Sequence, residues 1–232
     1  MGKRSRRVRE ARTASEQSAE GARRRGARLP SVRVAVAIVA MLAVAGIAGA
    51  FLLTSRTSAQ AYSCLSQLKN PAGLTGSDGF ATDSLGQKHV GRGARVSYGF
   101  CPPTSGDHFN APGNGPIQAG YYAPDQAVSP LGWVHNLEHG YVVAVYRCVN
   151  GTCPSGDDLA KLQQFGATGI PTSTARCDGR PKIVVARFDD MATPFAVLAW
   201  DRALMLDTID VNSAEAFAAK WMDVTAPEKG EC

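Results

Sequence analysis

One long apolar segment near the N-terminus restricts the fold of this chain more than any other feature does. Residues 34–53, "VAVAIVAMLAVAGIAGAFLL", form a run of twenty residues without a charge. A helix of this length spans about 30 Å, which matches the hydrocarbon core of a bilayer. The pattern therefore predicts one transmembrane helix.

The residues before this segment predict a disordered tail and an orientation. Residues 1–33 carry eleven Lys or Arg against three Glu, a net charge of +8, without apolar periodicity. Such a segment buries too little apolar surface to offset the entropy of ordering. Basic residues stay on the cytoplasmic side of a membrane, so we expect a cytoplasmic N-terminus and an extracytoplasmic C-terminal domain.

These features predict four segments of the chain. They are a disordered basic cytoplasmic tail (1–33), a transmembrane signal anchor (34–53), a short stem (54–63) and an exported domain (64–232). The alternative is a signal peptide cleaved after Ala61, where "AQA" has the small-x-small form of a cleavage site. The apolar run is longer than the roughly 7–15 residues usual in such peptides, which favours an uncleaved anchor.

The net charge of the whole chain differs in sign from the net charge of the predicted domain, because the tail is strongly basic. Residues 57–232 carry thirteen basic and seventeen acidic side chains, a net charge of −4, although the whole chain has +5. A nucleic-acid partner requires a basic face on the folded part, so we expect none. The basic tail is explained by membrane topology and by attraction to anionic lipid.

All six cysteines follow the apolar segment. They are Cys64, Cys101, Cys148, Cys153, Cys177 and Cys232. An even count in an oxidising compartment predicts up to three disulfides rather than a thiolate metal site. Cys148 and Cys153 flank Asn150-Gly151, a tight-turn pair that predicts a bond between them. A bond from Cys232 would hold the C-terminal tail.

Most of the predicted regular elements lie in the second half of the domain. Strands are predicted at residues 141–147 and 182–188, with a helix capped by Ser155 between them, which together make a right-handed βαβ unit. A hairpin is expected around Asp201-Arg202, and a closing helix that starts at Asn212. The first half is rich in Gly and Pro and has one convincing strand, residues 94–100. The predicted fold class is α+β, with a mixed sheet, a C-terminal helix and a loop-rich N-terminal half.

The histidines are confined to 51 of the 232 residues. They are His89, His108, His135 and His139. In "HNLEH", one turn of helix places His135 and His139 on the same face with Glu138 beside them. Gly140 then provides a left-handed stop before the next strand.

Two loops carry the remaining histidines toward a common site. "PPTSGDH" forms a rigid turn that ends in His108, and "KHVGRG" holds His89. Converging imidazoles with one carboxylate suit Zn²⁺ or Cu²⁺. We therefore expect His108, His135 and His139 to be metal ligands, with Glu138 as a fourth ligand or as the acceptor that orients a ring. His89 is a further candidate ligand.

Two other interpretations of these residues remain open. The imidazoles and Glu138 can instead satisfy the carbonyls and amides of the many loops. H-x-x-E-H is also the motif of inverted zinc metallopeptidases, in which Glu138 would polarise a zinc-bound water. That motif needs a long helix, whereas Gly140 ends this one.

The quoted motifs are similar to those of a known family. "GARVSYGFCPPTSGDHF", "GYYAPD", "VHNLEHGYVVAVY" and "KIVVARFDDMATPFAVLAWDRALMLDTID" resemble, in order and spacing, the bacterial domain-of-unknown-function family 3105 over roughly residues 89–223. The family's motif positions fall on His89, Pro102, Pro103, Thr104, Ser105, Gly106, His108, His135, Glu138, His139 and Gly140. The resemblance implies an exported or membrane-tethered protein and no particular activity. Cys101 lies outside the family motif, which favours a disulfide role over metal ligation.

The sequence thus predicts a membrane-anchored extracytoplasmic protein that binds Zn or Cu. One alternative is a metal-dependent hydrolase with Glu138 as general base, which needs an open coordination position. Another is a structural or interaction module of the cell envelope, with a protein partner and no metal.

Overall fold

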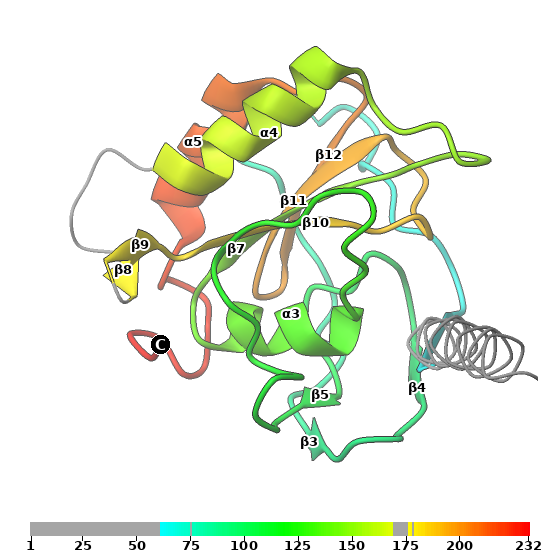
Figure 1. Cartoon of the computed structure of the whole chain (residues 1–232), viewed down its shortest axis with the longest axis vertical. Coiled ribbons are helices and arrows are strands. Elements are labelled where there is room, and N and C mark those ends of the chain that lie inside the picture. Colours follow the sequence, from blue (N-terminus) through cyan, green and yellow to red (C-terminus); the bar gives the residue numbers. More distant parts are fainter. Residues whose placement is uncertain (1–60, 75, 169–175, 178) are drawn as a thin grey trace, which may run out of the picture. The chain divides into compact units, whose positions relative to one another are not determined.

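A six-stranded mixed sheet lies at the centre of the part of the chain that the computed structural model describes, residues 61–74, 76–168, 176–177 and 179–232 (Figure 1). In spatial order its strands are β2 (Phe80–Ala81), β12 (Arg202–Leu206), β11 (Phe195–Ala199), β7 (Val142–Tyr146), β10 (Ile183–Arg187) and β6 (Gly120–Tyr121). β7 and β6 each run parallel to β10, whereas β11, β12 and β2 add antiparallel pairs. The predicted α+β class with a mixed sheet is confirmed.

Successive residues of the central strands pack alternately into two apolar cores, one on each face of the sheet. All five residues of β7 are buried. Val142, Ala144 and Tyr146 pack into one apolar cluster, and Val143 and Val145 pack into the other. Side chains alternate across a strand, so a strand without polar residues must be covered on both faces.

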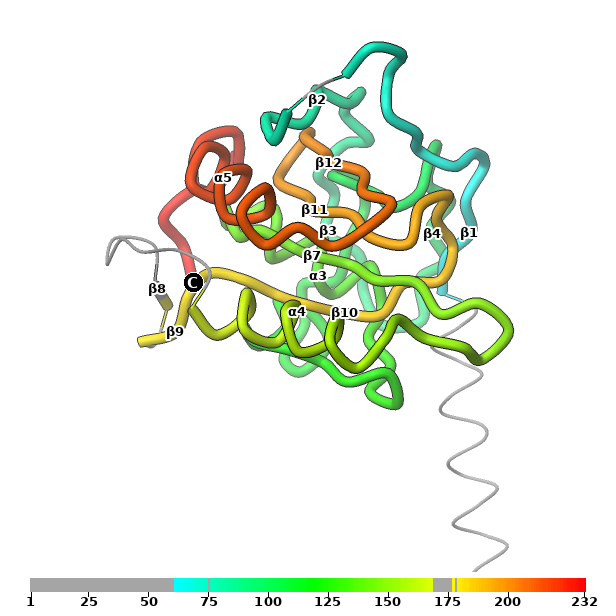
Figure 2. Tube along the Cα trace, turned by 90° about the horizontal axis from the view of Figure 1, so that it is seen from above, coloured from blue at the N-terminus to red at the C-terminus, as the bar shows by residue number. Residues whose placement is uncertain are grey.

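Two helices cover the first face of the sheet. α4 (Gly156–Thr168) packs against β10, and α5 (Val211–Trp221) packs against β11 (Figure 2). The predicted cap of α4 is confirmed, because Ser155 Oγ accepts a hydrogen bond from the Asp158 amide at 3.2 Å. The predicted start of α5 at Asn212 is late, because the helix begins at Val211 with Asp210 as its cap, and the Asp210 carboxylate accepts a hydrogen bond from the Asn212 amide. An aspartate satisfies the orphan amides of a first turn as well as an asparagine does.

The second face is covered by one helix and by loops. α3 (Pro130–Glu138) is buried along its whole length and contacts β7. It extends well upstream of the turn expected at residues 135–139. Ser129 caps it and Pro130 occupies its first turn. Proline is favoured there because its missing N–H would be unpaired in any case.

The N-terminal half is loop-rich, as predicted, and the strand expected at residues 94–100 is present as β4 (Val96–Tyr98), which pairs with β1 (Tyr62–Cys64). The sequence did not predict β1, the pair of β3 (His89–Val90) with β5 (His108–Phe109), or, in the C-terminal half, the pair of β8 (Arg176–Cys177) with β9 (Arg180–Pro181). Strands of two or three residues leave no periodic pattern in a sequence.

Three disulfides link loops and strand ends of the domain to one another. The predicted bond between Cys148 and Cys153 is present, and Cys232 is bonded to Cys177 near the C-terminal end. Cys101 is bonded to Cys64 rather than available for metal, as the family resemblance implied.

The predicted localisation requires a correction. No helix within the described residues is both long enough and apolar enough to cross a membrane. The predicted span, residues 34–53, and the tail before it lie outside those residues. A single-pass membrane anchor therefore has no support in the part of the chain that the structure describes.

Candidate metal centre

His89 and His108 are brought together by strand pairing. β3 and β5 run parallel, and their register sets His89 directly beside His108. Their ring centroids are 4.8 Å apart in an edge-to-face arrangement. Two residues that are far apart in the sequence thus become neighbours through a backbone pairing of only two residues per strand.

The turn before His108 is fixed by buried polar contacts. Thr104 and Ser105 are buried, and their hydroxyls bond Thr82 Oγ1 at 2.6 Å and the Leu85 amide at 2.9 Å. Gly106 has φ +118°, and a Cβ there would meet the ring of Tyr98. These two side chains thus hold the turn against residues 82–85.

The C-terminal end of α3 presents the other two members of the cluster. His135 and Glu138 are three residues apart, so they project from the same side of the helix. His139 is the C-cap, and Gly140 follows with φ +87°. Asp223 lies against Gly140 so closely that any side chain there would clash. The predicted left-handed glycine stop is confirmed.

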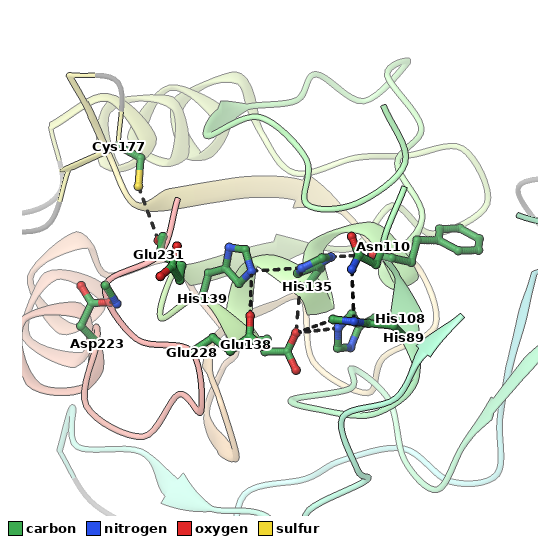
Figure 3. A network of polar contacts seen from close by, with 12 residues as sticks. His89, His108, Asn110, His135, Glu138, His139, Cys177, Asp223, Glu228 and Glu231 are labelled. Carbon is green, nitrogen blue, oxygen red and sulfur yellow. Dashed lines mark hydrogen bonds and ion pairs between the residues drawn. The ribbon is translucent and has the colours of Figure 1, made fainter. Parts of the chain in front are cut away.

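Three imidazoles converge on the carboxylate of Glu138 (Figure 3). The distances from Glu138 Oε2 are 2.8 Å to His108 Nε2, 3.0 Å to His89 Nε2 and 3.9 Å to His135 Nε2. One donor atom from each of these residues lies within 4.8 Å of all the others. Glu138 and His135 have side chains only 3% exposed and His108 is fully buried, whereas His89 is 39% exposed.

The opposite nitrogen of each ring is already engaged. Nδ1 of His108 donates to the Gly106 carbonyl at 2.7 Å, and Nδ1 of His135 donates to the Phe109 carbonyl at 2.6 Å. Nδ1 of His89 lies 3.2 Å from the Asn110 side-chain amide. A carbonyl only accepts, so a neutral His108 or His135 must carry its proton on Nδ1 and present a lone pair at Nε2.

The surroundings of α3 favour neutral imidazoles. Burial, helped by the neighbouring His108 and His139, lowers the pKa of His135 to about 4. Burial likewise lowers the pKa of His139. At neutral pH His135 therefore holds an unprotonated Nε2 that faces the cluster.

The structure assembles a different set of histidines from the one expected first. His89, the further candidate, lies inside the cluster with His108, His135 and Glu138. His139 lies at its edge, with Nε2 3.0 Å from His135 Nε2 and 3.3 Å from Glu228 Oε2. The expectation that the two rings of α3 lie side by side is met, because their centroids are 4.5 Å apart.

Two residues of the site were missed by the sequence analysis. Asn110 contacts His89, and Glu228 contacts His139 from the C-terminal tail. Asn110 follows His108 by two residues, which places it on the same side of an extended segment. The only available signal for Glu228 was Cys232, because a disulfide there implies that the tail is held against the domain.

A surface cleft of about 630 Å³ opens beside the cluster. His89, His135 and His139 line it from one side, and Glu228 and Glu231 from the tail. The cluster is therefore buried from behind and accessible from this cleft.

Sulfur is excluded from the site. Cys64, Cys101 and Asp190 also approach one another, but the two cysteines are bonded to each other. The cysteines within the described residues are all in disulfides. The donor set around Glu138 is therefore purely nitrogen and oxygen.

A comparison with protein families identifies the wider class. Residues 89–232 match the model of the family described as "Protein of unknown function (DUF3105)", so the chain belongs to this family. The match begins at His89 and includes the whole cluster. Comparisons with curated proteins and with solved structures give no match.

Proposed function

We propose that this protein binds a transition-metal ion, Zn²⁺ or Cu²⁺, between His89, His108, His135 and Glu138. The observation that carries the proposal is the convergence of atoms that accept hydrogen bonds and do not donate them. His108 Nε2, a lone pair in the neutral ring, lies 2.8 Å from a carboxylate oxygen. Two acceptors at this distance repel unless a cation lies between or beside them.

The geometry supports a metal ion as that cation. Ligands at about 2.0–2.1 Å in tetrahedral directions are separated by about 3.3 Å, and their imidazole centroids by about 5 Å. The oxygen-to-nitrogen distances at Glu138 run from 2.8 to 3.9 Å. The centroids of the three rings are 4.8, 4.8 and 5.0 Å apart. Only small side-chain shifts are needed to surround one ion.

The outer contacts support the same assignment. Metal-binding imidazoles usually donate their second nitrogen to a carbonyl or a carboxylate, which fixes the tautomer. His108 and His135 have such a bond to backbone carbonyls. The nitrogen and oxygen donor set suits Zn²⁺ or Cu²⁺, whereas Cu⁺ prefers the sulfur ligands that this cluster lacks.

A competing explanation is an additional proton instead of a metal. A protonated His108 beside the Glu138 carboxylate would form a buried ion pair and a purely structural cluster.

The hydrolase alternative with Glu138 as general base has less support. Glu138 Oε2 already contacts two imidazoles, so as a ligand it is not available to accept a proton from water.

Equilibrium binding separates these explanations. The full-length chain would be produced under oxidising conditions without a His tag, treated with chelator, and titrated with Zn²⁺ and then Cu²⁺. We expect tight binding that is lost in His89→Ala and in Glu138→Gln. His89 is partly exposed, so its removal should not unfold the protein.

The matched control is Glu215→Gln, which removes the same charge from α5, away from the cluster. It should bind as the wild type does. Folded wild-type protein that binds neither ion would contradict the proposal and favour the protonated, structural cluster.

A further inference from the structure

We infer that Glu138 is shared by a second, weaker metal site, which it forms with His139 and Glu228 at the mouth of the cleft. This inference rests on the proposed function, since it places a second ion beside the first. The two ions would use opposite sides of one carboxylate.

The second set of donor atoms is as compact as the first. One donor atom each from Glu138, His139 and Glu228 lies within 4.8 Å of the others. His139 Nε2 is 3.3 Å from Glu228 Oε2, close to the spacing of about 3.3 Å that two ligands of one zinc ion adopt. Glu138 has two oxygens, and two-metal sites hold their ions only about 3.5–4 Å apart.

Charge at the cleft also favours a cation there. The carboxylates of Glu138 and Glu228 approach within 4.8 Å, and Glu138 is almost completely buried. Two negative charges at this separation repel strongly in a partly dry site. A divalent ion between them removes that repulsion.

Glu228 is held in place by backbone contacts rather than by its side chain alone. Its amide donates to the Glu138 carbonyl at 3.1 Å, and the Asp223 amide donates to the Gly140 carbonyl at 3.0 Å. The disulfide between Cys177 and Cys232 fixes the tail a few residues further on. The tail is thus fastened to the helix end that carries Glu138 and His139.

Lys182 also holds the backbone at the C-terminal end of α3 in place. Its buried ammonium donates to the His139 carbonyl at 2.6 Å and to Asp223 Oδ1 at 2.7 Å. The backbone around His139 is therefore held from two sides, and the ligand positions of the second site do not depend on a loose surface loop.

Two features make the second site weaker and more open than the first. Nδ1 of His139 is buried and has no hydrogen-bond partner among the described residues, unlike Nδ1 of His108 or His135. Loss of such an outer contact costs about 10–100-fold in metal affinity. Three protein ligands also leave a position that faces the cleft, where water or an oxyanion can bind.

The alternative is an ordinary ion pair between His139 and Glu228. Such a pair, with Glu228 47% exposed, would contribute little to stability and nothing to metal binding. The two interpretations predict different numbers of bound ions, so stoichiometry distinguishes them.

The test is a calorimetric Zn²⁺ titration of the chelator-treated full-length chain and three variants. We expect two equivalents in the wild type, the second about 10–100-fold weaker. Glu228→Gln and His139→Ala should each retain only the tight equivalent. Glu231→Gln is the matched control, because it removes a carboxylate from the same tail and the same cleft but not from the second site. It should keep both equivalents.

A second readout uses Cu²⁺ and electron paramagnetic resonance. The signal should grow with the first equivalent and weaken on addition of the second, because two Cu²⁺ ions about 3.5–4 Å apart couple magnetically. In Glu228→Gln the signal from the first ion should persist without weakening.

The possible failures are distinguishable. A single equivalent in the wild type that His89→Ala abolishes would overturn the second site and leave the proposed function intact. Two equivalents that survive in Glu228→Gln would also overturn it. Absence of any binding would refute the proposed function and this inference together.

Discussion

The two faces of the central sheet differ in what covers them. On one face, α4 and α5 close a continuous apolar layer with side chains such as Phe165 and Phe217. On the other, α3 contributes Trp133 and Leu137 to an apolar layer and then turns its C-terminal end toward buried polar groups. The difference indicates a division of roles. The α4/α5 face stabilises the domain, and the α3 face carries the proposed metal site.

The largest expected effect tests the first half of this division. Phe165→Ala removes a fully buried ring on the α4/α5 face and should lower the free energy of unfolding by about 3–5 kcal/mol. Denaturant unfolding measures the loss. The affinity of the folded variant for Zn²⁺ should equal that of the wild type, and a change of more than about tenfold would contradict the separation of roles.

The next effect concerns pH and the α3 face alone. The folded state holds the pKa of His135 at about 4, below its ordinary value of 6.5, mainly by burial. The unfolded chain therefore binds more protons between these pH values, and stability present above about pH 6.5 is lost as the pH falls toward 4. In metal-free protein the loss from this group is on the order of 3 kcal/mol.

Unfolding of the chelator-treated wild type and of His135→Gln across this range measures the effect. The wild type should lose more stability on acidification than the variant. Equal losses in both proteins would mean that His135 does not titrate in this way.

A smaller effect should separate binding from stability within the α3 face. Asn110 is exposed but contacts Nδ1 of His89. A His89 that binds metal through Nε2 carries its proton on Nδ1, which then donates to the Asn110 side-chain oxygen once the amide is turned over. Asn110→Ala should therefore weaken Zn²⁺ binding by about 10–100-fold and leave the unfolding free energy nearly unchanged. Gln118→Ala removes another exposed amide and serves as the control. If both variants bind equally well, the outer contact has no role.

The smallest effect lies at the start of α4. Ser155→Ala removes the hydroxyl that accepts from the Asp158 amide and should cost about 1 kcal/mol without any change in Zn²⁺ affinity. Ser155→Asp keeps a capping oxygen and should restore most of the loss in a thermal unfolding experiment. Failure of Ser155→Asp to do so would argue against capping as the cause.

The sequence predicted the α4/α5 face well because its signals are local. β7, α4 and β10 each follow from a contiguous apolar or capping pattern, and the parallel order follows from their sequence. Asp201, with φ +53°, marks the expected turn between β11 and β12. The errors on this face were at element ends, where Asp210 and Asn212 offer equivalent caps, and at the two-residue edge strand β6, which was not predicted.

The α3 face was predicted only in part because its contacts are not local. The spacing of His135 and Glu138 within one helix was sufficient to predict their proximity. His89 reached the cluster through β3 and β5, whose two-residue pairing has no sequence pattern. Glu228 lies beside His139 because the disulfide between Cys177 and Cys232 holds the C-terminal tail against the domain, and no spacing in the sequence identifies Cys177 as the partner of Cys232. Assembly of such a site depends on long-range backbone pairing, which composition and periodicity do not encode.

His139 illustrates the same limit at closer range. A four-residue spacing predicts that its ring lies beside that of His135, and the rings do touch. As the C-cap residue, however, it lies one position beyond Glu138 and faces the tail. The position of His139, at the edge of the cluster rather than inside it, therefore depends on the element that packs against the end of α3, which is the C-terminal tail.

X-ray absorption at the zinc edge would identify the atoms bound to the ion in this cluster. Full-length protein loaded with one equivalent of Zn²⁺ reports the number and type of atoms bound to the ion. We expect three imidazole nitrogens and at least one oxygen at about 2.0–2.2 Å, without sulfur. A spectrum with sulfur, or with no more than one imidazole, would contradict a metal centre formed by His89, His108, His135 and Glu138.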